Sequence, residues 1–214
     1  MANIDFTINL QDFRVSENKL IDAIARHLRS VFKKVREPIR ARVGMAAAEA
    51  IRRAPEYTSL LTGKLRGELG VIDAAPVLEA VIRNIAAGCR VKSLGVRRVG
   101  KGIDGGLRIE LLKGDYSEVL KAPGRSFESE GGHQIDWLRW LTLEGDRIIV
   151  ADHRFVLNFS ERSRTGTGIM IRPGNWRVPP EFAGTDADNW LTRALGTIGR
   201  DILKILQEEI QRNV

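Results

Sequence analysis

The residue types that could support catalysis are few and widely separated in this sequence. The three histidines, His27, His133 and His153, have no carboxylates or cysteines beside them at metal-ligand spacing. The only cysteine, Cys89, has no histidine close to it in sequence, so a small buried apolar residue is the simpler interpretation. No serine lies in a nucleophile-elbow sequence. We therefore predict that the protein is not an enzyme and that it has no catalytic residue, metal or cofactor.

Two glycine-rich motifs are similar to nucleotide-binding loops. Gly95 to Lys101 fits the first seven positions of the phosphate-binding loop, but Gly102 replaces the serine or threonine that would hold magnesium. Residues 100–105 fit the dinucleotide fingerprint in the same way. Both motifs need a helix directly afterwards, whose first amides would bind the phosphate. Residues 107–111 alternate like a strand instead, so we predict a hairpin loop and no phosphate site.

This predicted hairpin, residues 89–112, carries the densest group of basic residues in the chain. They are Arg90, Lys92, Arg97, Arg98 and Lys101. The whole sequence has a net charge of +7 and a pI of about 9.9. Such a surface could contact DNA or an acidic partner, and a merely solvated basic surface is the alternative.

Two helical segments and a proline corner precede the hairpin. Residues 4–10 alternate like a short strand, Ser16 stands where an N-cap is expected, and apolar residues then recur at helical spacing to Val35. Pro38 should kink or break this helix, which resumes through Val43 to Ala54. Pro55 should end it, because proline disfavours the helical conformation of the residue before it. A polar turn is expected to follow, to Thr62-Gly63.

The rest of the chain predicts short elements and a final helix. A helix is expected from Asp73 to a left-handed glycine cap at Gly88, and a strand is the alternative, because the spacing of the apolar residues Val77, Val81, Ile82 and Ile85 does not decide between them. Trp137 and Trp140 should lie on a helical turn as core anchors, with an exposed interface pair as the alternative. Strands are expected at 148–150, 155–157 and 169–171, with an exposed loop at 160–168. A C-terminal helix should start near a Thr185–Asp188 capping box, run from Leu191 to Ile210 and pack closely at its two glycines, Gly196 and Gly199.

A family resemblance rests on the two ends of the chain. Ala54-Pro55, Thr62-Gly63 and Leu65-Arg66, together with the Trp176–Phe182 stretch before the last helix, resemble the tail-component proteins of tailed bacteriophages, which complete the tail or join it to the head. Residues 120–170 have no counterpart in that pattern. We therefore predict a single domain, 1–214, with a family-specific insertion at about 120–170.

The resemblance implies an α+β fold and a role in assembly. The expected subunit has long N-terminal helices, a central antiparallel β-sheet with extended loops, and a C-terminal helix packed on that sheet. Several copies would form a ring around the DNA channel at the neck or the top of the tail, as a hexamer or a dodecamer, beside connector, tail terminator or tail-tube proteins. The expected contacts with neighbouring subunits are made by Thr62, Gly63, Leu65, Arg66, Arg164, Thr165 and Gly166. The basic hairpin would face DNA or an acidic partner ring.

Composition sets the expected location. Hydrophobic residues make up 43% of the chain and charged residues 29%, as in ordinary globular proteins. No signal peptide and no apolar run of about 20 residues is evident, so we expect synthesis in the host cytoplasm, incorporation into the virion and no membrane contact. The alternative function is a sequence-independent nucleic-acid-binding protein that acts outside a virion.

Overall fold

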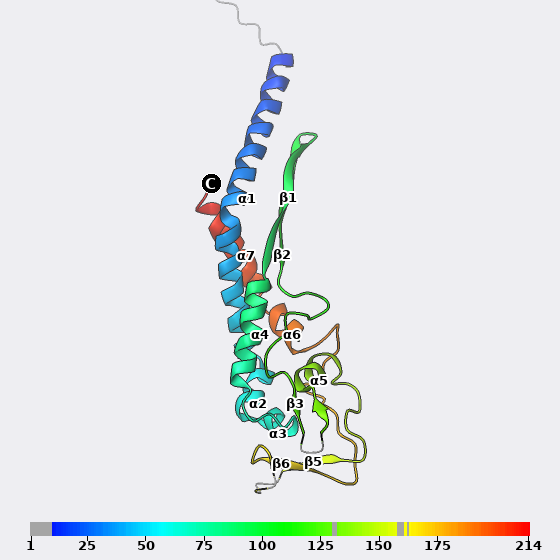
Figure 1. Ribbon diagram of the computed structural model, residues 1–214. Coiled ribbons are helices and arrows are strands. Elements are labelled where there is room, and N and C mark those ends of the chain that lie inside the picture. Colours follow the sequence, from blue (N-terminus) through cyan, green and yellow to red (C-terminus); the bar gives the residue numbers. More distant parts are fainter. Residues whose placement is uncertain (1–9, 130–131, 158–160, 162) are drawn as a thin grey trace, which may run out of the picture. The chain divides into compact units, whose positions relative to one another are not determined.

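The computed structural model describes residues 10–129, 132–157, 161 and 163–214, and it confirms an α+β fold (Figure 1). The helices are α1 (Leu10–Arg53), α2 (Pro55–Thr62), α3 (Lys64–Glu68), α4 (Ala75–Gly88), α5 (Trp137–Leu143), α6 (Trp190–Gly196) and α7 (Gly199–Gln211). The strands are β1 (Arg90–Val99), β2 (Gly102–Glu110), β3 (Phe127–Glu128), β4 (Gln134–Ile135), β5 (Arg154–Leu157) and β6 (Gly168–Ile171).

The chain forms two compact units. Unit 1 comprises Met1–Arg40, Arg90–Glu110 and Ile205–Val214, and unit 2 comprises Ala41–Cys89 and Leu111–Lys204. The single domain with an insertion at 120–170 stays a prediction.

Helix α1 is continuous, and the predicted break at Pro38 is wrong. A stripe of buried residues at every fourth position runs past the proline without a change of register, and its packing outweighs the lost hydrogen bond. The stripe consists of Val31, Val35, Ile39, Val43 and Ala47. Ser16 lies inside α1 and is not its cap. Of the strand predicted at 4–10, only Leu10 falls within the described residues, as the first residue of α1.

The predicted hairpin is confirmed in unit 1. Strands β1 and β2 pair antiparallel around a two-residue turn in which Gly100 has φ +60°, as short hairpin turns favour. The register shifts by one residue between Ser93 and Val96, which makes a β-bulge on β1. At this bulge Gly105 faces Gly95 so closely that a Cβ on Gly105 would lie 2.0 Å from the Gly95 carbonyl oxygen.

Two polar contacts join the hairpin to α1 within unit 1. Arg36 Nε donates to the Val91 carbonyl oxygen at 2.9 Å, and Arg98 Nε lies 3.8 Å from Asp22 Oδ1. Val91 and Val96 are buried, whereas Leu20 and Ile24 of the predicted apolar stripe of α1 are exposed. Some apolar side chains of unit 1 are therefore buried, and others remain exposed to solvent.

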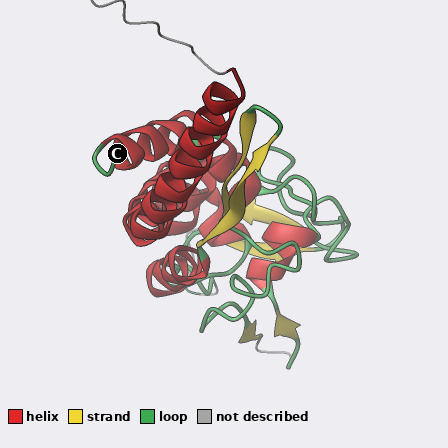
Figure 2. Ribbon diagram, turned by 90° about the horizontal axis from the view of Figure 1, so that it is seen from above, coloured by secondary structure: helices red, strands yellow, loops and turns green. Residues whose placement is uncertain are grey.

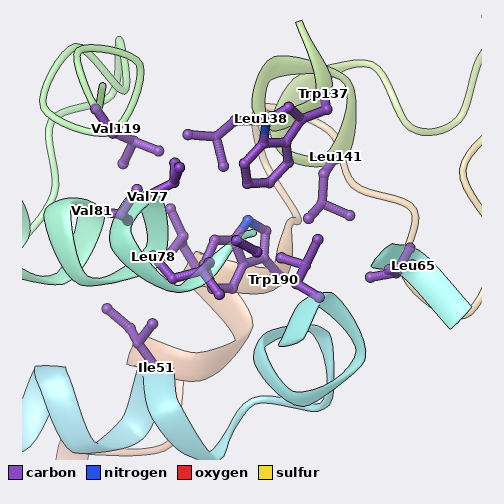
Figure 3. Close-up of a cluster of buried hydrophobic side chains, with 14 of the residues drawn as sticks. Ile51, Leu65, Val77, Leu78, Val81, Val119, Trp137, Leu138, Leu141 and Trp190 are labelled. Atoms are coloured by element: carbon purple, nitrogen blue, oxygen red, sulfur yellow. The ribbon is translucent and has the colours of Figure 1, made fainter. Parts of the chain in front are cut away.

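The core of unit 2 gathers side chains from the six helices α1 to α6, and Figure 3 shows part of it. Trp137 and Leu138 of α5 pack against Leu78 of α4 and Trp190 of α6, and all four are fully buried. The predicted helical turn at Trp137 is thus confirmed, and the alternative of an exposed tryptophan pair is wrong. Trp140 is half-buried, with its ring 6.3 Å from that of Trp176. Burial of these large rings supplies much of the hydrophobic stabilisation of unit 2.

The described strands form three separate antiparallel pairs and not one central sheet (Figure 2). These pairs are β1–β2, β3–β4 and β5–β6. The strands predicted at 155–157 and 169–171 are present as β5 and β6. In the segment 148–150 only Val150 makes a bridge, to Trp176, so that predicted strand is wrong.

Several predicted helix ends need correction. The segment after Pro55 is helix α2 and not a polar turn, with Pro55 as its first residue, a position where proline needs no amide hydrogen. Gly88 is the last residue of α4 and has no left-handed conformation.

The C-terminal helix is interrupted between α6 and α7. A Cβ on Gly196 or Gly199 would meet open space, so the predicted close packing at these glycines is wrong. Instead of resting on a sheet, Ile198 and Ile202 pack against Ala47 and neighbouring α1 residues within unit 2.

Candidate functional site

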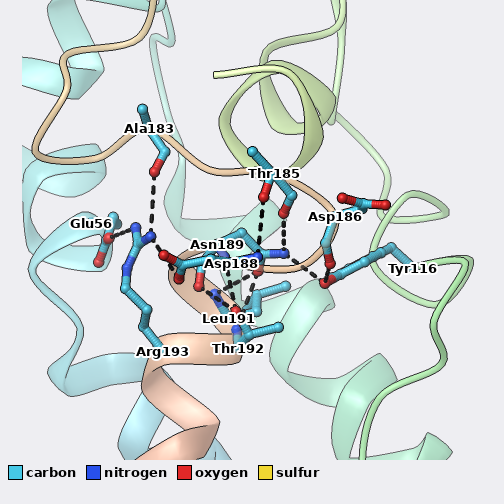
Figure 4. A network of polar contacts seen from close by, with 10 residues as sticks. All are labelled: Glu56, Tyr116, Ala183, Thr185, Asp186, Asp188, Asn189, Leu191, Thr192 and Arg193. Carbon is cyan, nitrogen blue, oxygen red and sulfur yellow. Dashed lines mark hydrogen bonds and ion pairs between the residues drawn. The ribbon is translucent and has the colours of Figure 1, made fainter. Parts of the chain in front are cut away.

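The start of α6 is fixed by a buried polar network around Asn189 (Figure 4). The Asn189 side-chain oxygen accepts from the amides of Leu191 and Thr192, and its Nδ2 donates to Tyr116 Oη at 2.7 Å and to the Thr185 carbonyl oxygen at 2.9 Å. Asn189 is therefore the true N-cap, and the predicted cap at Thr185 is wrong. Thr185 Oγ1 only accepts from the Asp188 amide in the preceding turn.

This cap positions Arg193, one turn into α6, against α2. Arg193 Nη2 donates to Glu56 Oε1 at 2.7 Å, and its Nη1 lies 3.3 Å from both Asp188 Oδ1 and the Ala183 carbonyl oxygen (Figure 4). Glu56 is only 2% exposed. A buried carboxylate requires such a partner, because transfer of an unpaired charge from water is costly.

The Glu56–Arg193 pair lies in the wall of a groove of about 750 Å³ in unit 2. We call it the helix-lined groove, because the end of α1 and helix α6 form its sides. Its lining residues are Ala46, Glu49, Ala50, Arg53, Ala54, Pro55, Glu56, Glu181, Trp190, Arg193, Ala194, Thr197, Ile198 and Asp201. The small alanine side chains of α1 and α6 leave the space open.

Acidic residues outnumber basic ones around this groove, four carboxylates to two guanidinium groups. Glu49 forms an ion pair with Arg53, and Glu181 lies 3.3 Å from Lys64 Nζ. Asp201, in the first turn of α7, is exposed and makes no ion pair with any residue in the described part of the chain. The groove therefore offers a small-residue floor beneath a rim of net negative charge.

The predicted contact residues of the proline corner have different environments. Thr62 is exposed at the end of α2, and Gly63 is the turn to α3, where a Cβ would lie 2.8 Å from Ser59 Cα. Leu65 is fully buried in the core of unit 2, so its predicted place at a subunit interface is wrong. Arg66 is half-buried, and its Nε has no hydrogen-bond partner among the described residues.

The predicted loop contacts lie beside this corner in unit 2. Arg164 stacks over the Phe127 ring at 3.8 Å, Thr165 shares a hydrogen bond with Thr167, and Gly166 is exposed with φ +74°. Thr167 also lies close to Gly67 of α3, since a Cβ added to Gly67 would be only 2.3 Å from Thr167 Oγ1. The two segments predicted to meet neighbouring subunits therefore pack against each other within one chain. The loop is not wholly exposed, since Ser163 and Gly168 are buried; residues 160 and 162 lie outside the described part.

The basic hairpin residues are partly neutralised within unit 1. Lys92 lies 2.8 Å from Glu110, Arg97 lies 3.5 Å from Asp104, and Arg98 pairs with Asp22. Arg90 and Lys101 make no ion pair with the described residues. Exposed pairs of this kind contribute little to stability and leave the side chains available to a partner.

The excess positive charge belongs to unit 1. The segments of unit 1 contain 15 Lys and Arg against nine Asp and Glu, whereas those of unit 2 contain 19 against 18. Unit 1 thus carries +6 of the total net charge of +7. Apolar side chains are exposed on the same hairpin, namely Leu94, Val99 and Ile103.

One buried carboxylate in unit 2 has a shifted pKa. Glu68 of α3 is 8% exposed, and its Oε2 accepts from Trp176 Nε1 at 2.9 Å. Burial raises the pKa of the Glu68 carboxyl, although the Trp176 hydrogen bond and the nearby Lys64 oppose the shift. In an exposed cluster, the hydrogen bond from Arg52 holds the pKa of Glu79 below its ordinary value. The described partners of Glu68 are Trp176 and Lys64 and those of Glu79 are Arg52 and Tyr57, so neither carboxylate has a histidine beside it.

Sequence reasoning missed Glu56, Arg193 and Asn189. Glu56 directly follows Pro55, at the first turn of a helix where an acidic residue is common, so it carried no signal of burial. Asn189 stands directly before the apolar helical run, where asparagine is a favoured N-cap, so it could have been recognised in the sequence.

Comparisons with protein-family models, characterised proteins and solved structures gave no significant match to this chain. No group of three or more His, Cys, Asp or Glu side chains suited to a metal ion occurs among the described residues. None of the described helices is both long and apolar enough to cross a bilayer.

Proposed function

We propose that this chain is a virion structural protein of a tailed bacteriophage, which assembles as a ring at the head–tail junction or the top of the tail. The proposal starts from the sequence resemblance around Ala54-Pro55 and Leu65-Arg66. In the structure this stretch is a corner, in which α1 ends at Arg53, Pro55 opens α2 and Gly63 turns the chain into α3.

The observation that carries the proposal is the uncovered surface of unit 1. Its hairpin exposes apolar and basic side chains together, and Leu20 and Ile24 are exposed on its helix. Apolar residues that a subunit leaves exposed near charged ones are typical of surfaces that become buried on association. A ring of identical subunits provides such burial by head-to-tail contacts.

The first test is the assembly state. Native mass spectrometry and negative-stain images of the purified chain should show a closed ring of six or twelve copies. A chain that stays monomeric at every protein and salt concentration would contradict the proposal. The genes on either side offer a second test, since portal, capsid and tail-tube genes are expected there.

A second candidate function is sequence-independent nucleic-acid binding, which the concentration of charge in unit 1 favours. In that case the isolated subunit should bind duplex DNA of any sequence. Its affinity should fall steeply with salt, because each neutralised phosphate releases counterions. Ring formation without measurable duplex binding would favour the structural role.

A further inference from the structure

We infer that the hairpin tip of one subunit docks into the helix-lined groove of a second copy of this chain. The hairpin tip is defined as Leu94, Arg97, Val99 and Lys101. The inference rests on the proposed function, because it names the contact that would join neighbouring subunits of the ring.

The hairpin tip presents an apolar and basic surface. Leu94 and Val99 are 56% and 55% exposed, and Arg97 and Lys101 are exposed beside them. Arg98 has the opposite orientation, since it pairs with Asp22 of α1. The outer side of the tip therefore combines two apolar side chains with two basic ones.

The helix-lined groove is complementary to the hairpin tip in its apolar surface and in its charge. Ala46, Ala50 and Ala194 provide small apolar surfaces, and a volume of about 750 Å³ has room for several inserted side chains. Glu49 and Asp201 are exposed on its rim, where they could meet basic side chains of the tip. Opposite charges across an interface steer association and fix its register.

Protein is a better occupant for this hairpin than DNA. A phosphate backbone is recognised by positive charge, and exposed Leu94 and Val99 would gain nothing from it. A partner with an apolar floor and an acidic rim uses both parts of the tip.

The hairpin tip and the groove are different surfaces, so each subunit would use one of each. Such heterologous contacts build a closed ring when the rotation between subunits closes.

Disulfide trapping tests the contact directly. Lys101→Cys and Glu49→Cys variants are made separately and mixed under mild oxidation; the native Cys89 is buried and should stay unreactive. We expect a crosslinked dimer from this mixture in excess of either variant alone. Lys121→Cys, an exposed lysine of unit 2 outside both surfaces, is the matched control and should give no excess with Glu49→Cys. Equal crosslinking of both lysine variants would overturn the inference.

Charge reversal provides an independent test. Arg97→Glu with Lys101→Glu should weaken self-association about tenfold or more, as should Glu49→Lys with Asp201→Lys, and the four changes together should restore it. Lys121→Glu with Arg177→Glu is the control for the change in net charge, and circular dichroism confirms folding.

The outcomes separate the two proposals. If rings persist unchanged in all variants, the docking contact is wrong while the proposed function stands. If the unmodified chain forms no ring, the proposed function fails as well. Loss of duplex DNA binding in the hairpin variant, with self-association intact, would assign the tip to nucleic acid and overturn the inference.

Discussion

Arg193 Nη2 lies 2.7 Å from Glu56 Oε1, although the two residues are 137 positions apart in the sequence. The pair connects α6 to α2, and one side of it faces the helix-lined groove. Because Glu56 is almost fully buried, the arginine is what makes a charge at this position tolerable.

Arg193→Met should therefore reduce the free energy of unfolding by about 3 kcal/mol, because it leaves the Glu56 charge buried without its partner. Urea unfolding measures the loss. The double variant Glu56→Gln with Arg193→Met removes the buried negative charge as well, so it should recover part of the lost unfolding free energy. If the double variant is as unstable as the single one, the arginine acts through packing and not through the ion pair.

Gly67→Ala should destabilise unit 2 by about 1–3 kcal/mol through overpacking, because the new Cβ would lie 2.3 Å from Thr167 Oγ1. Helix propensity alone predicts the opposite sign, since alanine favours a helix by about 1 kcal/mol over glycine. Thermal unfolding should show the loss, and Thr167→Ala in the same chain should relieve most of it. Gly106→Ala, at a site with open space, is the control, and an equal loss there would argue against the steric explanation.

Pro38→Ala should stabilise α1 by up to about 3 kcal/mol, because it restores an amide donor inside a continuous helix. Pro38 is exposed, so no core packing is lost with its ring. A higher midpoint of thermal unfolding and more helical circular dichroism are expected. A lower midpoint would show that the proline has a favourable role in unit 1.

Glu68→Gln should change how stability depends on pH. The raised pKa means that the folded state holds the proton more tightly than the unfolded state. Between the ordinary carboxyl value of 4.5 and that raised pKa, the contribution of Glu68 to the stability of the natural protein falls as the pH rises. Glutamine keeps an oxygen acceptor for Trp176 and cannot ionise. The unfolding free energy of the variant, compared with that of the natural protein, should thus become larger as the pH rises from 4.5 toward neutrality. A difference between the two proteins that stays constant with pH would contradict the raised pKa of Glu68.

Local patterns predicted the elements whose signals are contained in a few neighbouring residues. The corner at Pro55, the hairpin and the turn of α5 follow from proline chemistry, strand alternation or helical spacing. For α4 the apolar spacing left a strand open, and the structure has a helix. The continuity of α1 could not be predicted in this way, because it depends on what packs against the stripe on both sides of Pro38. The separation of the strands into three pairs depends likewise on contacts between distant segments.

The candidate site was predictable only in part. The charge of the hairpin was visible in the sequence, whereas the intrachain partners Asp22, Asp104 and Glu110 depend on register and on helix packing. Leu65 was predicted at an interface because it belongs to the motif, but an apolar residue in a short helix is buried wherever the core lies within reach. The groove requires α6 to approach the alanines of α1, which no local pattern encodes.

The bulge in β1 explains why an apolar residue ends up outside at the end of this strand. A reader who counts alternate residues from Val91 would place Val99 inward and Arg98 outward, and the actual orientations are the reverse. The strand contains one residue more than its pairing needs. An evolutionary deletion of Leu94 would be absorbed there, and the arginines would keep their orientation. A deletion further along the strand, at Arg97 for example, would turn every following side chain to the opposite face. Related genes should therefore tolerate a one-residue deletion at the bulge near Gly95 but not between Val96 and Val99.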